Sequence, residues 1–347
     1  MLKKISAGAI GFLSFVSIYA QKDSTKKATT TFTGSLDAYY RFNFSDPPGG
    51  TNNLTSFTNS QNSFELGMAS LRVDHSYGKV SATIDVGFGK RAQEFSYNDI
   101  GTTLTAVKQA YVSFAPSSNL KFTIGKWATH CSYEVPDAYL NRNYSMSYGF
   151  SYGPFFHTGV KADIALGGKS TLMLGIANPT DYVSAPTTVK VLIAQFNTGS
   201  KNDKLKAFLN FQGSTGFTHF NLVLSGTLSS QFSVGYDGTF SSTKIGTENS
   251  SWKSHAIYLN YDPVSTFGLI LRGDYFDDRK LSPLITSGPV VANKIFATTL
   301  SANVKVDNLT IIPELRLDNA TGAVFSKGSG AATKSTASFI LAVVYKF

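Results

Sequence analysis

The sequence is poor in charge and in cysteine, and each shortage excludes a class of protein. Charged residues make up 15% of the 347-residue chain, against about 25% in an ordinary soluble domain. The single cysteine, Cys131, cannot form an internal disulfide and excludes a zinc site built from several cysteines. A water-soluble barrel or sandwich stays possible, but it would usually carry more charge.

Long apolar runs and basic clusters are also missing. Beyond the extreme N-terminus, no stretch offers the ~18 consecutive apolar residues that a transmembrane helix needs. The net charge is +9, yet the lysines and arginines after residue 20 are spread singly or in pairs, with no basic run longer than a pair such as Lys26-Lys27. Nucleic acid is therefore not an expected partner. The aromatic fraction of 13% excludes a wholly disordered chain.

Signatures of catalysis and of cofactor binding are weak. The histidines are scattered along the chain: His75, His130, His157, His219 and His255. None forms a His-x₃-His metal pair, and the run 167–170 (Gly-Gly-Lys-Ser) fits a hairpin turn better than a phosphate-binding loop. A Ser–His pair brought together by the fold stays open as a hydrolase alternative. We expect no enzyme, no metal and no cofactor.

The N-terminus is typical of a secretory signal. Lys3 and Lys4 precede a mostly apolar stretch that is too short to span a bilayer, and Ala20 is a plausible cleavage point. An uncleaved anchor is the alternative. We therefore expect a signal peptide at 1–20, a polar tail at 21–30 and one barrel domain at 31–347.

The rest of the chain alternates with a period of two. In the stretch 32–44, Phe32, Leu36 and Tyr40 share one face, while Asp37 and Arg41 share the other. Such a strand is half buried. In a sandwich its apolar face meets another sheet, whereas in a membrane barrel it meets lipid and the polar face lines the lumen.

Sixteen segments carry this alternation. They are 31–44, 61–77, 79–91, 103–114, 119–127, 155–166, 170–178, 188–198, 203–213, 217–226, 230–241, 252–262, 266–277, 293–306, 308–318 and 335–347. About ten residues cross the bilayer and about ten connect, which fits an even-numbered antiparallel barrel. A change of phase near Ala69 predicts a bulge, and Pro313 predicts a local irregularity because proline cannot complete the ladder.

The links between these segments alternate in length. Every second link is tight, as periplasmic turns are, and most of the others are long: 45–60, 92–102, 128–154, 278–292 and 319–334. Link 214–216 breaks the rule. The last segment alternates up to Phe347, and a soluble sandwich gains nothing from a large apolar residue at its carboxylate. The sequence therefore predicts an all-β transmembrane up-and-down barrel of about sixteen strands.

Several short motifs resemble a known family. They are 108–112 (Lys-Gln-Ala-Tyr-Val), 125–127 (Gly-Lys-Trp), 141–145 (Asn-Arg-Asn-Tyr-Ser), 156–160 (Phe-His-Thr-Gly-Val) and 312–316 (Ile-Pro-Glu-Leu-Arg). In order and spacing they are similar to the OmpL-like β-barrel porins of Gram-negative outer membranes. The resemblance implies an outer-membrane channel, with a C-terminal strand ending in Phe347 that the barrel-assembly machinery reads. It assigns no functional residue.

The link 128–154 is the longest and the third on its side of the barrel. Its many aromatic residues argue against disorder, and a structureless loop of this length is usually functional or disordered. We expect it to fold into the lumen and narrow the pore; an ordered cap outside the barrel is the alternative. The constriction candidates are Tyr133, Glu134, Asp137, Tyr139 and Arg142. Cys131 is expected to have no role.

Side chains along a strand point alternately inward and outward, and this alternation, here called parity, places a set of charged side chains in the lumen. The basic ones are Arg41, Lys121, Lys161, Lys190, Lys204, Lys206, Arg272, Lys305, Arg316 and Lys346, and the acidic ones are Asp37, Asp85, Asp163, Asp237, Asp274, Glu314 and Asp318. This small positive excess predicts a mild anion preference. The alternative is that these charges only neutralise each other across neighbouring strands, as Lys161 and Asp163 could do.

We therefore expect a porin through which small hydrophilic solutes or ions diffuse passively, with outer-membrane lipid around it. Two alternatives remain: a plugged surface barrel whose loops adhere or serve a structural role, and a membrane-embedded hydrolase. Many porins are trimers, but the sequence shows no interface signature.

Overall fold

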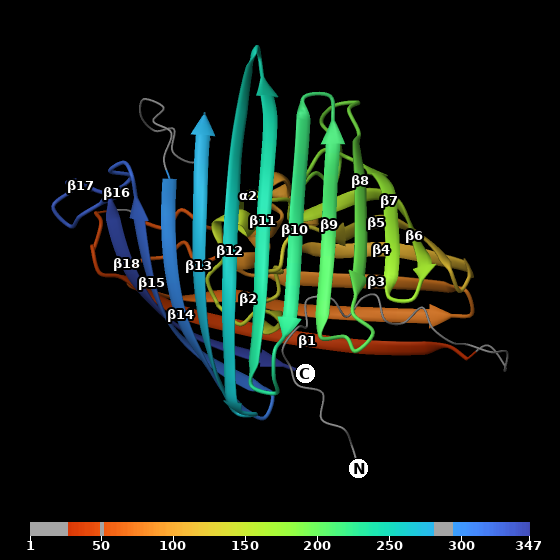
Figure 1. Cartoon of the computed structure of the whole chain (residues 1–347), viewed down its shortest axis with the longest axis horizontal. Coiled ribbons are helices and arrows are strands. Elements are labelled where there is room, and N and C mark those ends of the chain that lie inside the picture. Colours follow the sequence, from red (N-terminus) through yellow and green to blue (C-terminus); the bar gives the residue numbers. More distant parts are fainter. Residues whose placement is uncertain (1–26, 49–51, 281–293) are drawn as a thin grey trace.

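A computed structural model describes residues 27–48, 52–280 and 294–347. In this part of the chain sixteen antiparallel strands close into one barrel, in which β1 pairs with β18 and the other neighbours follow the order of the sequence (Figure 1). The predicted fold class is confirmed. The expected signal peptide at 1–20 lies outside the described residues.

The barrel strands are β1 (Thr29–Asn43), β2 (Ser63–Tyr77), β3 (Val80–Phe88), β4 (Val107–Ser117), β5 (Leu120–Ala128), β6 (Phe156–Gly167), β7 (Ser170–Ala177), β8 (Val191–Gly199), β9 (Leu205–Ser214), β10 (Phe217–Thr227), β11 (Phe232–Ile245), β12 (Glu248–Val264), β13 (Phe267–Lys280), β14 (Lys294–Val306), β15 (Leu309–Ala320) and β18 (Ser335–Lys346). Every predicted segment overlaps one of them, although 79–91 runs into α1 and 103–114 begins in η3. Strand β1 begins at Thr29, inside the stretch expected to be the polar tail.

The remaining elements are short and lie in the links. They are α1 (Lys90–Phe95), η2 (Tyr97–Asp99), η3 (Thr103–Ala106), η4 (Ala138–Leu140), α2 (Tyr148–Tyr152), and a small hairpin of β16 (Phe325–Ser326) and β17 (Ala332–Thr333). Among the described residues, no helix is both long and apolar enough to cross a membrane.

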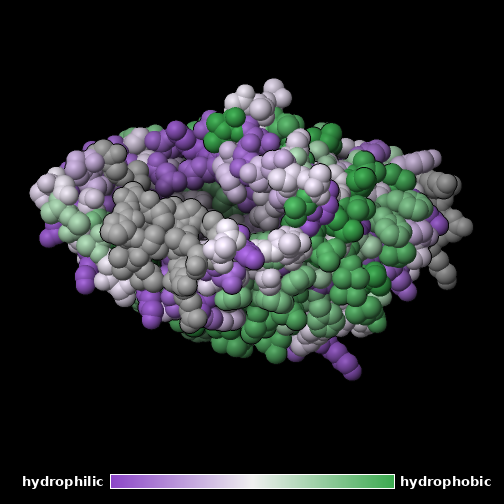
Figure 2. All heavy atoms as spheres, turned by 90° about the horizontal axis from the view of Figure 1, so that it is seen from above, coloured by the Kyte–Doolittle hydropathy of each residue, from purple (hydrophilic) through white to green (hydrophobic). Residues whose placement is uncertain are grey.

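The period of two separates the inside of the barrel from its outside. In β18, Ile340, Ala342 and Val344 are at most 2% exposed, whereas Leu341 and Val343 are at least 40% exposed. The same alternation in the other strands gives an outer surface rich in apolar side chains and an interior rich in polar ones. Figure 2 shows apolar residues along the visible outer wall and a hollow inside it.

The two ends of the barrel differ. At one end, here the turn end, all links are tight; the other end, here the loop end, carries the long links and two tight ones, 215–216 and 246–247. The first tight link was expected. The second lies in the gap between predicted segments 230–241 and 252–262, where hairpin β11–β12 rises highest in Figure 1. This part of the hairpin is mostly Ser, Thr, Lys and Glu, so it lacked the apolar alternation that marks a strand.

Both expected irregularities are present. The register between β1 and β2 shifts at Asp37/Ala38, which leaves Gly67 as the extra residue, two positions from the expected Ala69. A Cβ at Gly67 would lie 1.8 Å from the Asp37 carboxylate, so glycine is needed at this close approach. Around Pro313 the pairing with β14 is interrupted between Glu314 and Ile311, while the pairing with β18 continues.

Candidate functional site: the loop in the lumen

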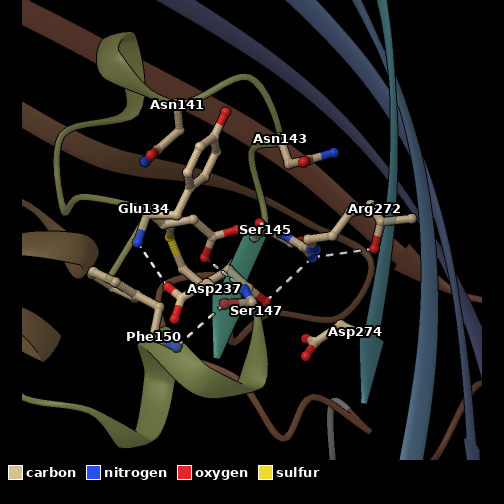
Figure 3. A network of polar contacts seen from close by, with 12 residues as sticks. Glu134, Asn141, Asn143, Ser145, Ser147, Phe150, Asp237, Arg272 and Asp274 are labelled. Atoms are coloured by element: carbon tan, nitrogen blue, oxygen red, sulfur yellow. Dashed lines mark hydrogen bonds and ion pairs between the residues drawn. The ribbon is translucent and has the colours of Figure 1, made fainter. Parts of the chain in front are cut away.

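The long loop between β5 and β6 lies inside the barrel. Every residue from Asn143 to Phe150 is buried, and helix α2 packs against the inner faces of β11, β12 and β13. A cap outside the barrel would leave one side of the loop in water, so the inward arrangement expected from the sequence is the one observed. Figure 3 shows the loop in front of the wall strands.

Carboxylates of the wall accept hydrogen bonds from the backbone of this loop. Asp237 on β11 accepts from Tyr133 N at 2.7 Å, and Asp274 on β13 accepts from Tyr148 N at 2.6 Å. Glu314 on β15 accepts from the N–H groups of Tyr144 and Ser145 at 2.8 and 3.1 Å. Hydrogen bonds to charged groups contribute about 1.5–3 kcal/mol each, so these contacts fix the loop to β11, β13 and β15.

Arginines satisfy the carbonyl groups of the same segment. Arg272 on β13 donates to Ser145 O at 2.7 Å, and Arg316 on β15 donates to Met146 O at 2.7 Å. From the other side, Arg91 of α1 donates to Tyr144 O at 3.1 Å. The irregular segment 144–146 thus has its buried carbonyl groups paired, which is what burial requires.

One ion pair joins loop and wall through side chains. Glu134 Oε1 lies 2.7 Å from Arg272 Nη1, and both side chains are at most 3% exposed. The second Glu134 oxygen accepts from Ser147 N at 2.7 Å, so this carboxylate also closes the loop on itself. In Figure 3, Arg272 reaches from its strand towards Glu134 and Ser145, with Asp274 beside it.

Tyrosines add further contacts to the wall. Tyr144 donates to Asp37 on β1 at 2.6 Å, and Tyr148 donates to Asp318 on β15 at 2.9 Å. Burial, followed by these carboxylates, raises the pKa of both phenols well above the usual value, so both stay protonated donors. Tyr133 stacks on Tyr258 of β12 with 4.3 Å between ring centroids.

The other constriction candidates also meet the wall. Asp137 binds Lys108 of β4, and Arg142 forms a bidentate pair with Asp262 at the end of β12. Tyr139 packs against the cluster around Tyr39, with Lys346 Nζ 5.1 Å from its ring centroid. All five candidates therefore lie in the lumen, but mainly as anchors of the loop.

The pore-lining candidates fall into two groups. The first points inward, as parity predicted, but its charged ends meet the loops or each other: Arg41, Asp85, Arg272, Asp274, Glu314 and Arg316 are all at most 5% exposed. Arg41 donates to Ser60 O at 2.6 Å, and Asp85 accepts from Lys108 and Gln109. Parity gives the direction of a side chain but not what fills the lumen in front of it.

The second group lies towards the turn end. Lys121 and Lys161 each have Nζ 3.6 Å from the carboxylate of Asp163, so two cations share one anion. Lys206 and Lys305 are partly exposed on inward positions. Lys204 was expected on a strand but lies in the turn before β9, and Lys190 lies in the link before β8; both are exposed.

Sequence reasoning missed several buried charges. Lys108 points inward because the register of β3 and β4 shifts between Asp85 and Val86, which turns two consecutive residues to the lumen. Arg91 was expected at the end of a strand but lies in α1, and Asp181 comes from the link before β8, where no periodicity exists to reveal it. Asp181 Oδ1 accepts from the N–H groups of Phe155 and Phe156 at 2.7 and 2.9 Å. It thereby fixes the point where the long loop enters β6.

Among the cavities that the described residues line, two lie on opposite sides of the loop. The loop-end cavity has a volume of about 410 Å³, and the turn-end cavity has a volume of about 180 Å³. The turn-end cavity is lined by Lys121, Lys161 and Arg72 together with Asp85 and Glu134. His219 borders the first cavity and His130 the second, and no residue borders both.

The thiol of Cys131 lies in the lining of the turn-end cavity. Burial raises the pKa of the Cys131 thiol to about 12, which keeps it protonated and unreactive. Within 27–48, 52–280 and 294–347, no three side chains of His, Cys, Asp or Glu converge as metal ligands would.

Residues 29–347 match the model of one family, described as "Putative beta-barrel porin-2, OmpL-like". The chain therefore belongs to this family, as its motifs suggested. The family and the barrel together place the chain in the outer membrane of a Gram-negative bacterium. No curated protein is detectably similar in sequence.

Solved structures share the fold at low sequence identity. The anion-selective porin from Comamonas acidovorans superposes with a TM-score of 0.63 at 11% identity, over 92% of this chain and 100% of that one. OmpT of Vibrio cholerae, expressed in the outer membrane, gives 0.59 at 11% identity, over 94% and 100%. Its in-vitro folded trimer form gives 0.59 at 14% identity, over 92% and 99%.

Proposed function

We propose that this chain is a passive porin whose lumen is narrowed by the loop 128–154 and which mildly prefers anions. The observation that carries the proposal is a closed barrel with an apolar outer face whose longest loop is bonded to the inner faces of several strands, with cavities left beside it. Small hydrophilic solutes and ions would cross by diffusion, without a cofactor and without catalysis.

The distribution of charge supports the sign of the selectivity. Glu134 pairs with Arg272, and Asp274 and Glu314 accept hydrogen bonds from loop N–H groups, so all three carboxylates are buried away from the solution. The partly exposed lysines at the turn end remain beside the solution, where they raise the local concentration of anions. Mobile ions screen charges over about 8 Å at physiological ionic strength, so the preference is mild.

The C-terminal strand suits recognition by the assembly machinery. Phe347 pairs with Gly34 of β1 through two backbone hydrogen bonds of 2.9 Å, and its ring lies over Gly34, where a Cβ would clash at 2.0 Å. Phe347 therefore extends the pairing of β1 with β18 that closes the barrel. We also propose that residues 1–20 are a cleaved signal peptide, which N-terminal sequencing of the mature protein would test.

Planar-bilayer recording tests the proposed function. Purified protein should give discrete current steps in KCl, and under a tenfold KCl gradient the reversal potential should show a modest anion preference. Protein that inserts without steps would instead be a plugged surface barrel. Turnover of ester substrates by the purified protein would favour the hydrolase alternative.

A further inference from the structure

The loop-end cavity has a lining unlike the rest of the lumen. Aromatic rings border it on several sides: Tyr97, Tyr152, Phe155, Phe217 and the imidazole of His219. Hydroxyl groups lie between the rings, on Ser56, Ser151, Thr180 and Ser241. The only formal charges in the lining are the carboxylates of Glu94 and Asp181; no lysine or arginine lines it.

We propose that this cavity is a saccharide-binding site at the mouth of the channel. A pyranose ring has apolar C–H faces and a rim of hydroxyl groups. Aromatic rings cover such faces, while hydroxyl and carboxylate oxygens pair with the rim. The volume of about 410 Å³ lies within the ~300–1,000 Å³ typical of small-molecule sites.

The carboxylates favour a neutral polyhydroxy ligand over a cation. Asp181 is occupied, since it accepts from Phe155 N, Phe156 N and the Tyr97 hydroxyl. Burial raises its pKa to about 7, so at neutral pH it carries only part of a negative charge. Glu94 accepts from Phe57 N and Asn59 through one oxygen and is partly exposed along the wall, as a hydroxyl acceptor would be.

The ring of His219 in the lining offers a buried nitrogen to which a ligand could hydrogen-bond. His219 is 1% exposed, and its Nε2 has no hydrogen-bond partner within the described part of the chain. Leaving such a group unpaired costs about 1–3 kcal/mol, which a bound hydroxyl group would recover. The site goes beyond passive diffusion, because binding at the mouth makes sugar passage saturable.

The test uses the full-length channel in a planar bilayer. Glucose or maltose added at the loop end should reduce the KCl current in a saturable way, with half-saturation in the millimolar range. Sorbitol, an open-chain polyol without a ring face, should not do so at the same concentration. A current that responds equally to glucose and sorbitol would overturn the site, as would block by tetramethylammonium but not by sugar.

Two substitutions at Tyr97 separate the contribution of its aromatic ring to sugar binding from that of its hydroxyl group. Tyr97→Leu should raise the half-saturating sugar concentration about two- to tenfold, because an aromatic contact is lost. Tyr97→Phe keeps the ring and should stay close to the unmodified channel. Tyr77→Leu, at an exposed tyrosine at the turn end of β2, is the matched control and should leave sugar block unchanged.

Unaltered KCl conductance shows that each variant is folded. Equal sugar block in all three variants would contradict the inference while leaving the porin function intact. Absence of any current steps would instead contradict the porin function itself, so the two failures are distinguishable.

Discussion

Glu134 and Arg272 form a buried ion pair that fixes the long loop to β13, with 2.7 Å between Oε1 and Nη1. Each partner also binds the loop backbone, Glu134 at Ser147 N and Arg272 at Ser145 O. The pair is therefore part of a hydrogen-bond network that joins the loop backbone to β13. Its removal tests whether the loop depends on the wall for its position.

Arg272→Met should detach this part of the loop. Removing one partner of a buried ion pair leaves the other charge unpaired and costs about 3–5 kcal/mol. We expect a lower urea midpoint of unfolding in lipid vesicles and noisier single-channel currents. The double variant Glu134→Gln/Arg272→Met should recover part of the loss.

Arg72→Met is the matched control for this experiment. Its pair with Asp74 is 27% and 39% exposed, and exposed pairs contribute about 0–1 kcal/mol. Equal effects of Arg72→Met and Arg272→Met would show that the loop does not depend on the buried pair.

The exposed apolar side chains of β18 predict how a substitution there affects insertion of the protein into a lipid bilayer. Val343 is 40% exposed between inward-facing Ala342 and Val344. Val343→Arg should reduce folding into vesicles, because a basic residue on the lipid face is destabilising, by up to about 2–4 kcal/mol at the bilayer midplane. Val343→Leu should fold like the unmodified chain. Normal folding of the arginine variant would place Val343 away from lipid.

The anion preference should depend on the two lysines that share Asp163. Lys121→Gln and Lys161→Gln together should shift the reversal potential in a tenfold KCl gradient towards cations. Lys169→Gln removes an exposed lysine that pairs with Asp203 in a turn, and it should change little. Cation preference in the unmodified channel would show that acidic residues, such as Glu94 at the loop end, dominate.

The sequence predicted the barrel well because lipid imposes a strict period of two on every strand. The same signal failed in the upper part of β11 and β12, where the hairpin rises beyond the apolar band and Ser and Thr occupy both faces. It also misplaced Lys204, which lies one residue before β9. The inward and outward positions of residues were predicted correctly where one face of a strand meets lipid and the other meets the polar lumen. The prediction failed where both faces meet water.

The interior was harder to predict than the wall. Parity correctly turned Arg272, Asp274 and Glu314 inward, but it could not show that the loop occupies the space in front of them. The pairing of Glu314 with the backbone of Tyr144 links residues 170 positions apart, and no local pattern encodes such a contact. Lys108 was missed because a bulge reverses parity on its strand.

Single-channel conductance of the chain lacking Tyr133 to Tyr148 tests the account most directly. Joining Ser132 to Gly149 through a short glycine linker removes most of the loop while leaving every barrel strand in place. If the loop narrows an open pore, the unmodified protein gives discrete steps and the shortened protein gives larger ones. Absence of steps in the unmodified protein, or steps of equal size in both, would contradict the account.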